Sequence, residues 1–199
     1  MTAITLDFHS VVDLTDAQFS KLCQANPDIK LERTAKGELI VMPPTGGETG
    51  KRNTKITQRL ANWADDDARG VVFDSSTGFK LPNGADRSPD ASWVKLERWQ
   101  ALTPVQRQKF PPLAPDFVIE LMSATDSLET TQAKMQEYRD NGVRLGWLID
   151  PQNQLVEVYH QGQDVEVVHM LSTLSGEDVL PEFVLSLQNM ALLKKDMNY

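Results

Sequence analysis

Three charged side chains draw attention through the segments that carry them. Asp90 follows a proline after a turn-rich loop, Glu120 lies inside the apolar run PDFVIELM at 115–122, and Lys134 follows in a helical segment. Burying a carboxylate in such a run is costly unless it is paired, protonated or bound to a metal. If the segments of Asp90 and Glu120 are adjacent strands, two hard oxygen ligands converge in a way that suits Mg²⁺. The chemistry that this pattern favours is metal-assisted hydrolysis.

The run 115–122 is expected to be an interior strand because both of its faces are apolar apart from its acids. Asp116 and Glu120 point to the same face but stand roughly 13 Å apart, so they cannot share one ion. We expect Asp116, near the preceding loop, to be a solvated acid at the start of the strand. For Glu120 two readings stay open, a salt-bridged buried acid and a metal ligand.

Lys134 belongs to a helix expected over 128–141. It lies about 40° from Tyr138 around the helix axis, at the edge of the face that we expect to be buried. From there its ammonium can lean toward the preceding strand. The alternative is a surface lysine whose apolar stem packs beside the core.

The elements that must position these residues follow from capping, turn and periodicity signals. We expect helices over 15–24, 48–64 and 128–141, and an irregular segment over 95–114. Strands are expected over 31–34, 38–42, 70–74, 78–81, 91–94, 115–122, 144–149, 155–160, 165–170 and 183–187. This order predicts an α/β fold with a mixed sheet packed against helices, in a single domain over 1–199.

Composition limits the functions that are plausible. The chain of 199 residues carries a net charge of −8, which argues against coating nucleic acid through bulk charge but not against a nuclease. The single cysteine, Cys23, excludes an intrachain disulfide framework and a thiolate-built metal site. Without a signal-peptide pattern or an apolar stretch near the ~20 residues of a membrane helix, we expect a soluble cytoplasmic protein.

Two surface features bear on partners. Lys51, Lys55 and Arg59 recur every four residues and form one stripe of the helix over 48–64. The stripe is either a solvated helix face or a strip that contacts DNA phosphates near the mouth of the site. The C-terminal hairpin and the strand at 183–187 offer edges that favour a homodimer.

Several stretches resemble the Uma-type restriction-endonuclease family within the PD-(D/E)XK nuclease superfamily. They are PPTGGETG (43–50), FDSSTGFKLPNGADRSPDASW (73–93), PDFVIELMSATDSL (115–128), KMQEYRDNGVRLGWLIDP (134–151) and LSGEDVLPEF (174–183). The resemblance implies a restriction-endonuclease-like fold. In that fold a central mixed β-sheet of four or five strands is flanked by helices, with additional N- and C-terminal strands.

The resemblance also implies roles for individual residues. Asp90 and Glu120 match the two catalytic acids, and together with the backbone carbonyl of Leu121 they would hold Mg²⁺ or Mn²⁺. The superfamily's strand lysine would stand at 122, where this chain has Met122. Lys134 is therefore its expected catalytic substitute.

Two further acids are weaker candidates, and one residue departs from the family's pattern. Glu48, at the start of the second helix, falls near the place where many members carry another catalytic acid. Glu32 is weaker still, because an acid in a hairpin has an obvious place in solvent. Asn53 stands where many relatives have a histidine, which leaves the contribution of that helix open.

The activity that these observations imply is metal-dependent endonucleolytic hydrolysis of phosphodiester bonds in DNA. The alternative is a catalytically silent binding or interaction module that keeps the nuclease fold. The net charge and the missing strand lysine favour that alternative, while the joint presence of Asp90, Glu120 and Lys134 favours the nuclease. A small enzyme acting on another phosphoester is a third reading.

Overall fold

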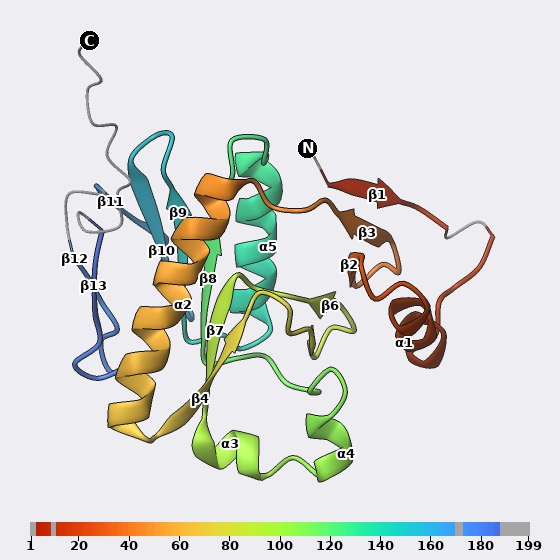
Figure 1. Ribbon diagram of the computed structural model, residues 1–199, viewed down its shortest axis with the longest axis horizontal. Coiled ribbons are helices and arrows are strands. Elements are labelled where there is room, and N and C mark those ends of the chain that lie inside the picture. Colours follow the sequence, from red (N-terminus) through yellow and green to blue (C-terminus); the bar gives the residue numbers. More distant parts are fainter. Residues whose placement is uncertain (1–2, 9–10, 170–172, 188–199) are drawn as a thin grey trace.

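The computed structural model describes residues 3–8, 11–169 and 173–187 (Figure 1). Its largest sheet has six strands in the order β11-β10-β9-β8-β7-β4. Their bounds are β4 Gly70–Asp74, β7 Ala91–Lys95, β8 Phe117–Leu121, β9 Leu145–Asp150, β10 Leu155–His160 and β11 Glu166–His169. Only β8 and β9 of this sheet pair in parallel, and helix α5 (Leu128–Asp140) connects them. The expected mixed sheet is confirmed, with six strands instead of four or five.

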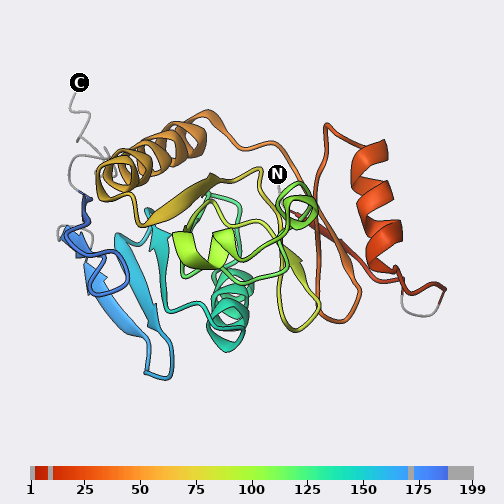
Figure 2. The same cartoon turned by 90° about the horizontal axis from the view of Figure 1, so that it is seen from below.

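Two helices cover the opposite faces of this sheet, as Figure 2 shows for α2 (Gly47–Asp67) and α5. Leu60 of α2 packs in one core cluster with Phe117 and Ile119, whereas Tyr138 of α5 packs in another cluster with Val118. The two clusters divide β8 by alternate residues, because successive side chains of a strand point to opposite faces. The parity expected for this strand is therefore confirmed.

A second sheet carries the N-terminal part of the chain, in the order β1-β3-β2-β6-β5. Its strands are β1 Ile4–Leu6, β2 Lys30–Arg33, β3 Leu39–Met42, β5 Phe79–Lys80 and β6 Asp86–Arg87. Helix α1 (Asp16–Ala25) packs on one face of it, where Phe19 meets Leu31 of β2. The alternation along β2 leaves Lys30 and Glu32 on the other face.

The two sheets meet where one strand leads directly into another. β6 of the second sheet ends at Arg87, and β7 of the large sheet begins at Ala91. The three residues between them are Ser88, Pro89 and Asp90. Asp90 is therefore fixed at the junction of the sheets by the backbone on both sides.

Some short elements were not expected from the sequence. The segment 95–114 contains α3 (Leu96–Gln100) and α4 (Pro104–Arg107), so the prediction of an irregular segment is wrong there. Thr103 and Gln106 form a capping box that starts α4, a signal present in the sequence. The strands β1, β6 and β12 (Thr173–Ser175) are too short to show periodicity, and β12 pairs with β13 (Val184–Ser186). The end of the strand expected over 165–170 falls at Met170, outside the described residues.

Within the described ranges, none of the helices combines the length and the apolar character needed to cross a membrane.

Candidate active site

Hydrogen bonds from strand β8 and helix α2 hold the carboxylate of Asp90. Its Oδ2 accepts a hydrogen bond from the backbone N–H of Leu121 on β8, at 2.8 Å. Its Oδ1 accepts one from Nδ2 of Asn53 on α2, at 3.1 Å. The antiparallel register pairs Ala91 with Ile119, so the preceding Asp90 stands at the level of Glu120. The adjacency of the two acid-bearing segments, a condition of the sequence hypothesis, is present in the fold.

Glu120 faces α5 and is 8% exposed. The phenol of Tyr138 donates a hydrogen bond to its Oε1 at 3.0 Å, and Nζ of Lys134 lies 2.8 Å from the same oxygen. Tyr138 and Lys134 are one helical turn apart, so both side chains reach β8 from the same side of α5. The structure thus pairs this acid with a buried cation.

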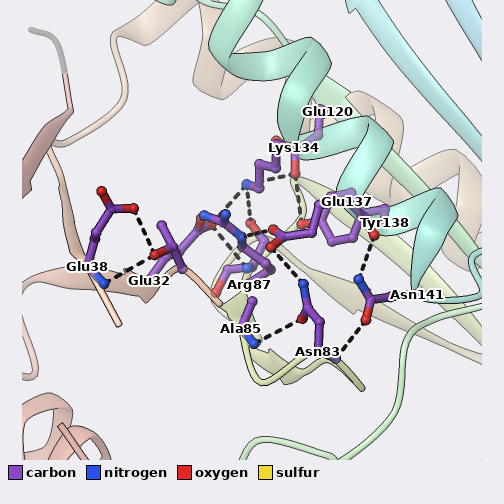
Figure 3. A network of polar contacts seen from close by, with 12 residues as sticks. Glu32, Glu38, Asn83, Ala85, Arg87, Glu120, Lys134, Glu137, Tyr138 and Asn141 are labelled. Atoms are coloured by element: carbon purple, nitrogen blue, oxygen red, sulfur yellow. Dashed lines mark hydrogen bonds and ion pairs between the residues drawn. The ribbon is translucent and has the colours of Figure 1, made fainter. Parts of the chain in front are cut away.

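Lys134 lies between two carboxylates rather than in solvent, as Figure 3 shows. Besides Glu120, its Nζ contacts Oε1 of Glu32 at 2.9 Å and the carbonyl oxygen of Ser88 at 3.4 Å. Its side chain is 13% exposed. The reading of Lys134 as a surface lysine is excluded by these contacts.

The solvent position expected for Glu32 is wrong. Glu32 is 1% exposed and accepts hydrogen bonds from the backbone N–H of Ser88 at 3.0 Å and from Arg87 at 3.2 Å. The reason is the alternation of β2. Because Leu31 and Arg33 face α1, Glu32 must face the junction, which the segment after β6 and helix α5 cover.

Arg87 belongs to the site through two carboxylate partners that the sequence did not predict. Its Nε donates to Glu137 of α5 at 2.5 Å, while its Nη1 contacts Glu32 (Figure 3). The arginine therefore ties β6 to both β2 and α5. Nothing in the local sequence distinguishes it from a surface arginine, since its partners come from distant parts of the chain.

The electrostatics of the two buried acids differ. Burial raises the pKa of Glu120 to about 7, with Asp90 and Glu32 adding to the rise and Lys134 opposing it. Burial alone would also raise the pKa of Glu32, but Lys134 and Arg87 outweigh it and hold that pKa at about 2. Glu32 is therefore the permanent anion of the pair, and Glu120 the acid that titrates near neutrality.

Two other acids considered from the sequence have no described contact with Asp90, Glu120 or Lys134. Glu48 is exposed in the first turn of α2, and none of its described contacts reaches Asp90, Glu120 or Lys134. Asp116 is only 3% exposed, so the expectation that it stays solvated is wrong. Its Oδ2 accepts a hydrogen bond from the backbone N–H of Lys95 and forms an ion pair with Arg98. Asp116 therefore has a structural role at the end of β7.

The basic stripe of α2 lies on the outer side of that helix. Lys51 and Lys55 are exposed and Arg59 is half-buried, while Asn53 contacts Asp90. At 100° per residue the three cations stand about 120–160° from Asn53 around the helix. The stripe therefore points away from Asp90, and DNA contact by these residues stays a prediction.

The oxygen atoms at the junction suit a hard divalent cation. Asp90 is half-buried, and no hydrogen bond from the described residues reaches Oε2 of Glu120. Asn53 adds a buried amide oxygen, Oδ1, that has no hydrogen-bond partner among them. The described residues contain no cluster of three or more His, Cys, Asp or Glu that could hold a metal ion, so the acids available here are Asp90 and Glu120 alone. Few carboxylates and several waters are the usual surroundings of Mg²⁺.

Met122 occupies the place of the missing strand lysine and is buried in the core beside Met135 and Tyr138. The strand thus presents no cation there, and the ammonium of Lys134 reaches Glu120 from the helix instead. Leu121 uses its N–H to bind Asp90. The metal-ligand role of its carbonyl stays a prediction.

The mixed sheet has one parallel pair and is flanked by helices, with Asp90 directly before β7 at the level of Glu120 on β8, as in a restriction-endonuclease-like fold. The chain belongs to the Uma2 family, described as "Putative restriction endonuclease", whose model matches residues 16–188. It is also similar to a solved structure from Anabaena variabilis ATCC 29413, described as a "putative nuclease belonging to DUF820". That match has a TM-score of 0.69 and 22% sequence identity, and covers 82% of this chain and 91% of the other. No curated protein matches the chain.

Proposed function

We propose that the protein is a metal-dependent endonuclease that hydrolyses phosphodiester bonds in DNA. The observation that carries the proposal is the 2.8 Å approach of the Lys134 ammonium to Glu120, on the strand whose next residue binds Asp90. The descriptions of the family and of the similar Anabaena structure both name a nuclease, which supports this class of activity.

In this proposal Asp90 and Glu120 hold Mg²⁺ or Mn²⁺, with the carbonyl of Leu121 as a further oxygen ligand. Such an ion, when bound, polarises the scissile phosphate and lowers the pKa of a bound water. Asn53 orients the carboxylate of Asp90 through its hydrogen bond. The N–H of Leu121 fixes the other oxygen, so the acid cannot rotate freely.

Lys134 supplies the positive charge beside the reacting phosphate. Two of its three N–H groups are used by Glu32 and Glu120, whereas its contact with the Ser88 carbonyl is long, at 3.4 Å. The third N–H is thus the one that can turn toward a water or a phosphate oxygen. Its positive charge stabilises the negative charge that develops on the phosphate during in-line attack.

The first experiment is a cleavage assay on supercoiled plasmid, linear duplex, single-stranded DNA and RNA, each with Mg²⁺, Mn²⁺ or a chelator. The wild type should cut DNA only with a cation, and Asp90→Asn and Glu120→Gln should each abolish cleavage. Glu129→Gln is the matched control, because Glu129 is an exposed acid in the first turn of α5. Cleavage that persists in chelator would contradict the proposal.

Calorimetric titration of Mn²⁺ separates the nuclease from the catalytically silent interaction module. We expect binding heat for the wild type and for Glu129→Gln, and its loss in Glu120→Gln. Equal heats in wild type and Glu120→Gln, together with no cleavage of any substrate, would favour the interaction module. The cytoplasmic location and the homodimer stay predictions, and light scattering of the purified protein tests the latter.

A further inference from the structure

Three cationic side chains, Arg87, Lys134 and Lys30, lie at the junction of the two sheets. They differ in how many of their N–H groups are bonded to carboxylates. Arg87 is 8% exposed and pairs with Glu32 and Glu137. Lys134 gives two N–H groups to Glu32 and Glu120. Arg87 is thus taken up by two carboxylates, and Lys134 keeps a single N–H, the one that the proposed function directs to the reacting water or phosphate.

Lys30 is the third cation and is engaged far less. It begins β2 and lies on the same face as Glu32, half-buried at the junction. Among the described residues its one hydrogen bond runs from Nζ to the carbonyl oxygen of Ser88, at 3.3 Å. No ion pair joins it to a described carboxylate, although its charge helps to lower the pKa of Glu32. An ammonium has three N–H groups, so two remain for another acceptor.

The position of Lys30 connects it to the proposed active site. The Ser88 carbonyl accepts from both Lys30 and Lys134, so the two ammonium groups share one oxygen. Ser88 lies two residues before Asp90 in the segment that joins the sheets. A half-buried ammonium with unused N–H groups can donate hydrogen bonds to a phosphodiester oxygen, and it lies near the two acids proposed to bind the cation.

We propose that Lys30 is a substrate-binding residue that contacts a backbone phosphate of the nucleic acid at this site. The inference rests on the proposed function and names the residue that holds the substrate there. A chain with a net charge of −8 cannot attract nucleic acid through its overall field, so a local cation must do so. Lys51, Lys55 and Arg59 point away from Asp90, whereas Lys30 faces the junction.

The test measures binding of a fluorescent DNA duplex in chelator over a range of salt concentrations, and then KM and kcat with Mg²⁺. Lys30→Ala should weaken binding and raise KM about five- to tenfold with a smaller change in kcat. It should also reduce the slope of log K against log salt by about 1, because one phosphate contact is lost. Lys30→Arg should restore most of the affinity.

Lys36→Ala is the matched control, since Lys36 is an exposed lysine at the turn of the same hairpin and carries the same charge. It should bind and cleave as the wild type does. If Lys30→Ala matches the wild type in affinity, salt slope and KM while the wild type cleaves DNA, the assignment of Lys30 fails and the proposed function stands. Equal losses in Lys30→Ala and Lys36→Ala would also overturn it, because the effect would then be bulk charge. A wild type that neither binds nor cleaves nucleic acid refutes the proposed function and this inference together.

Discussion

Oε1 of Glu32 lies 2.9 Å from Nζ of Lys134, although the two residues are separated by 102 positions in the chain. The pair joins the β2–β3 hairpin of one sheet to the helix that covers the other. Because Lys134 also contacts Glu120, the hairpin acid determines where the ammonium stands relative to the proposed metal ligands. Glu32 is therefore a positioning residue for the ammonium of Lys134.

Replacing Glu32 by Gln should destabilise the fold. The amide keeps an acceptor for the Ser88 N–H but removes the charge that neutralises Lys134 and Arg87 in a buried place. Breaking such a buried pair costs about 3–5 kcal/mol, so the urea midpoint should fall clearly. Glu38→Gln, on the same hairpin and half-buried, should change the free energy of unfolding by less than about 1 kcal/mol. Indistinguishable midpoints for Glu32→Gln and wild type would show that the buried ion pair contributes no stability.

The stability of the metal-free protein should depend on pH through Glu120. Its pKa of about 7 lies above the ordinary 4.5, so the folded state holds a proton that the unfolded state releases in between. Stability should therefore decrease as the pH rises from about 4.5 to 7 and level off above, by up to about 3 kcal/mol relative to Glu120→Gln. Urea unfolding of both proteins in chelator at pH 5, 6, 7 and 8 measures the difference. A constant difference across this range would contradict the raised pKa.

Glu32 should act in the opposite direction and at lower pH. Its pKa of about 2 lies below the ordinary 4.5, so its contribution is present above pH 4.5 and is lost as the pH falls toward 2. The difference in unfolding free energy between wild type and Glu32→Gln should therefore shrink below pH 4.5. If the difference is as large at pH 3 as at pH 7, the ion pairs of Glu32 are not its source.

Lys134 should matter more for rate than for metal binding. Lys134→Met removes the charge beside the proposed scissile phosphate, and single-turnover cleavage should fall at least about 100-fold. The Mn²⁺ affinity should change less, since both acids remain. Lys134→Arg keeps the charge and serves as a folded control, with an intermediate rate expected. Loss of rate and of Mn²⁺ affinity by the same factor would assign Lys134 to metal binding instead.

Asn53 should influence the metal site through Asp90. Asn53→Ala removes the 3.1 Å hydrogen bond to Oδ1, and loss of such an outer partner typically weakens metal binding about 10- to 100-fold. Thr57→Ala, one turn further along α2, is the control and should bind Mn²⁺ as the wild type does. Unchanged Mn²⁺ affinity in Asn53→Ala would show that the N–H of Leu121 is sufficient to orient Asp90.

The sequence by itself determined the local elements and the side chains that each presents. Thr15 predicted the start of α1, and the apolar run at 115–122 predicted the interior strand β8. The alternation of that run placed Glu120 on the face opposite Phe117 and Ile119. The spacing of Lys134 and Tyr138 predicted that the lysine could lean toward that strand. These features depend on contacts between residues close in the chain or on the geometry of a single strand. Both can be predicted from the spacing of residues in the sequence.

Only the tertiary structure decided which distant residues complete the site. Glu32 was expected in solvent because a hairpin acid has no local partner, yet it is buried when the segment after β6 and helix α5 cover that face of β2. The same packing brings Lys30 and Arg87 to the junction of the sheets. The burial of a charge depends on which segments fold over it, and the partners that make such burial tolerable lie far away in the sequence.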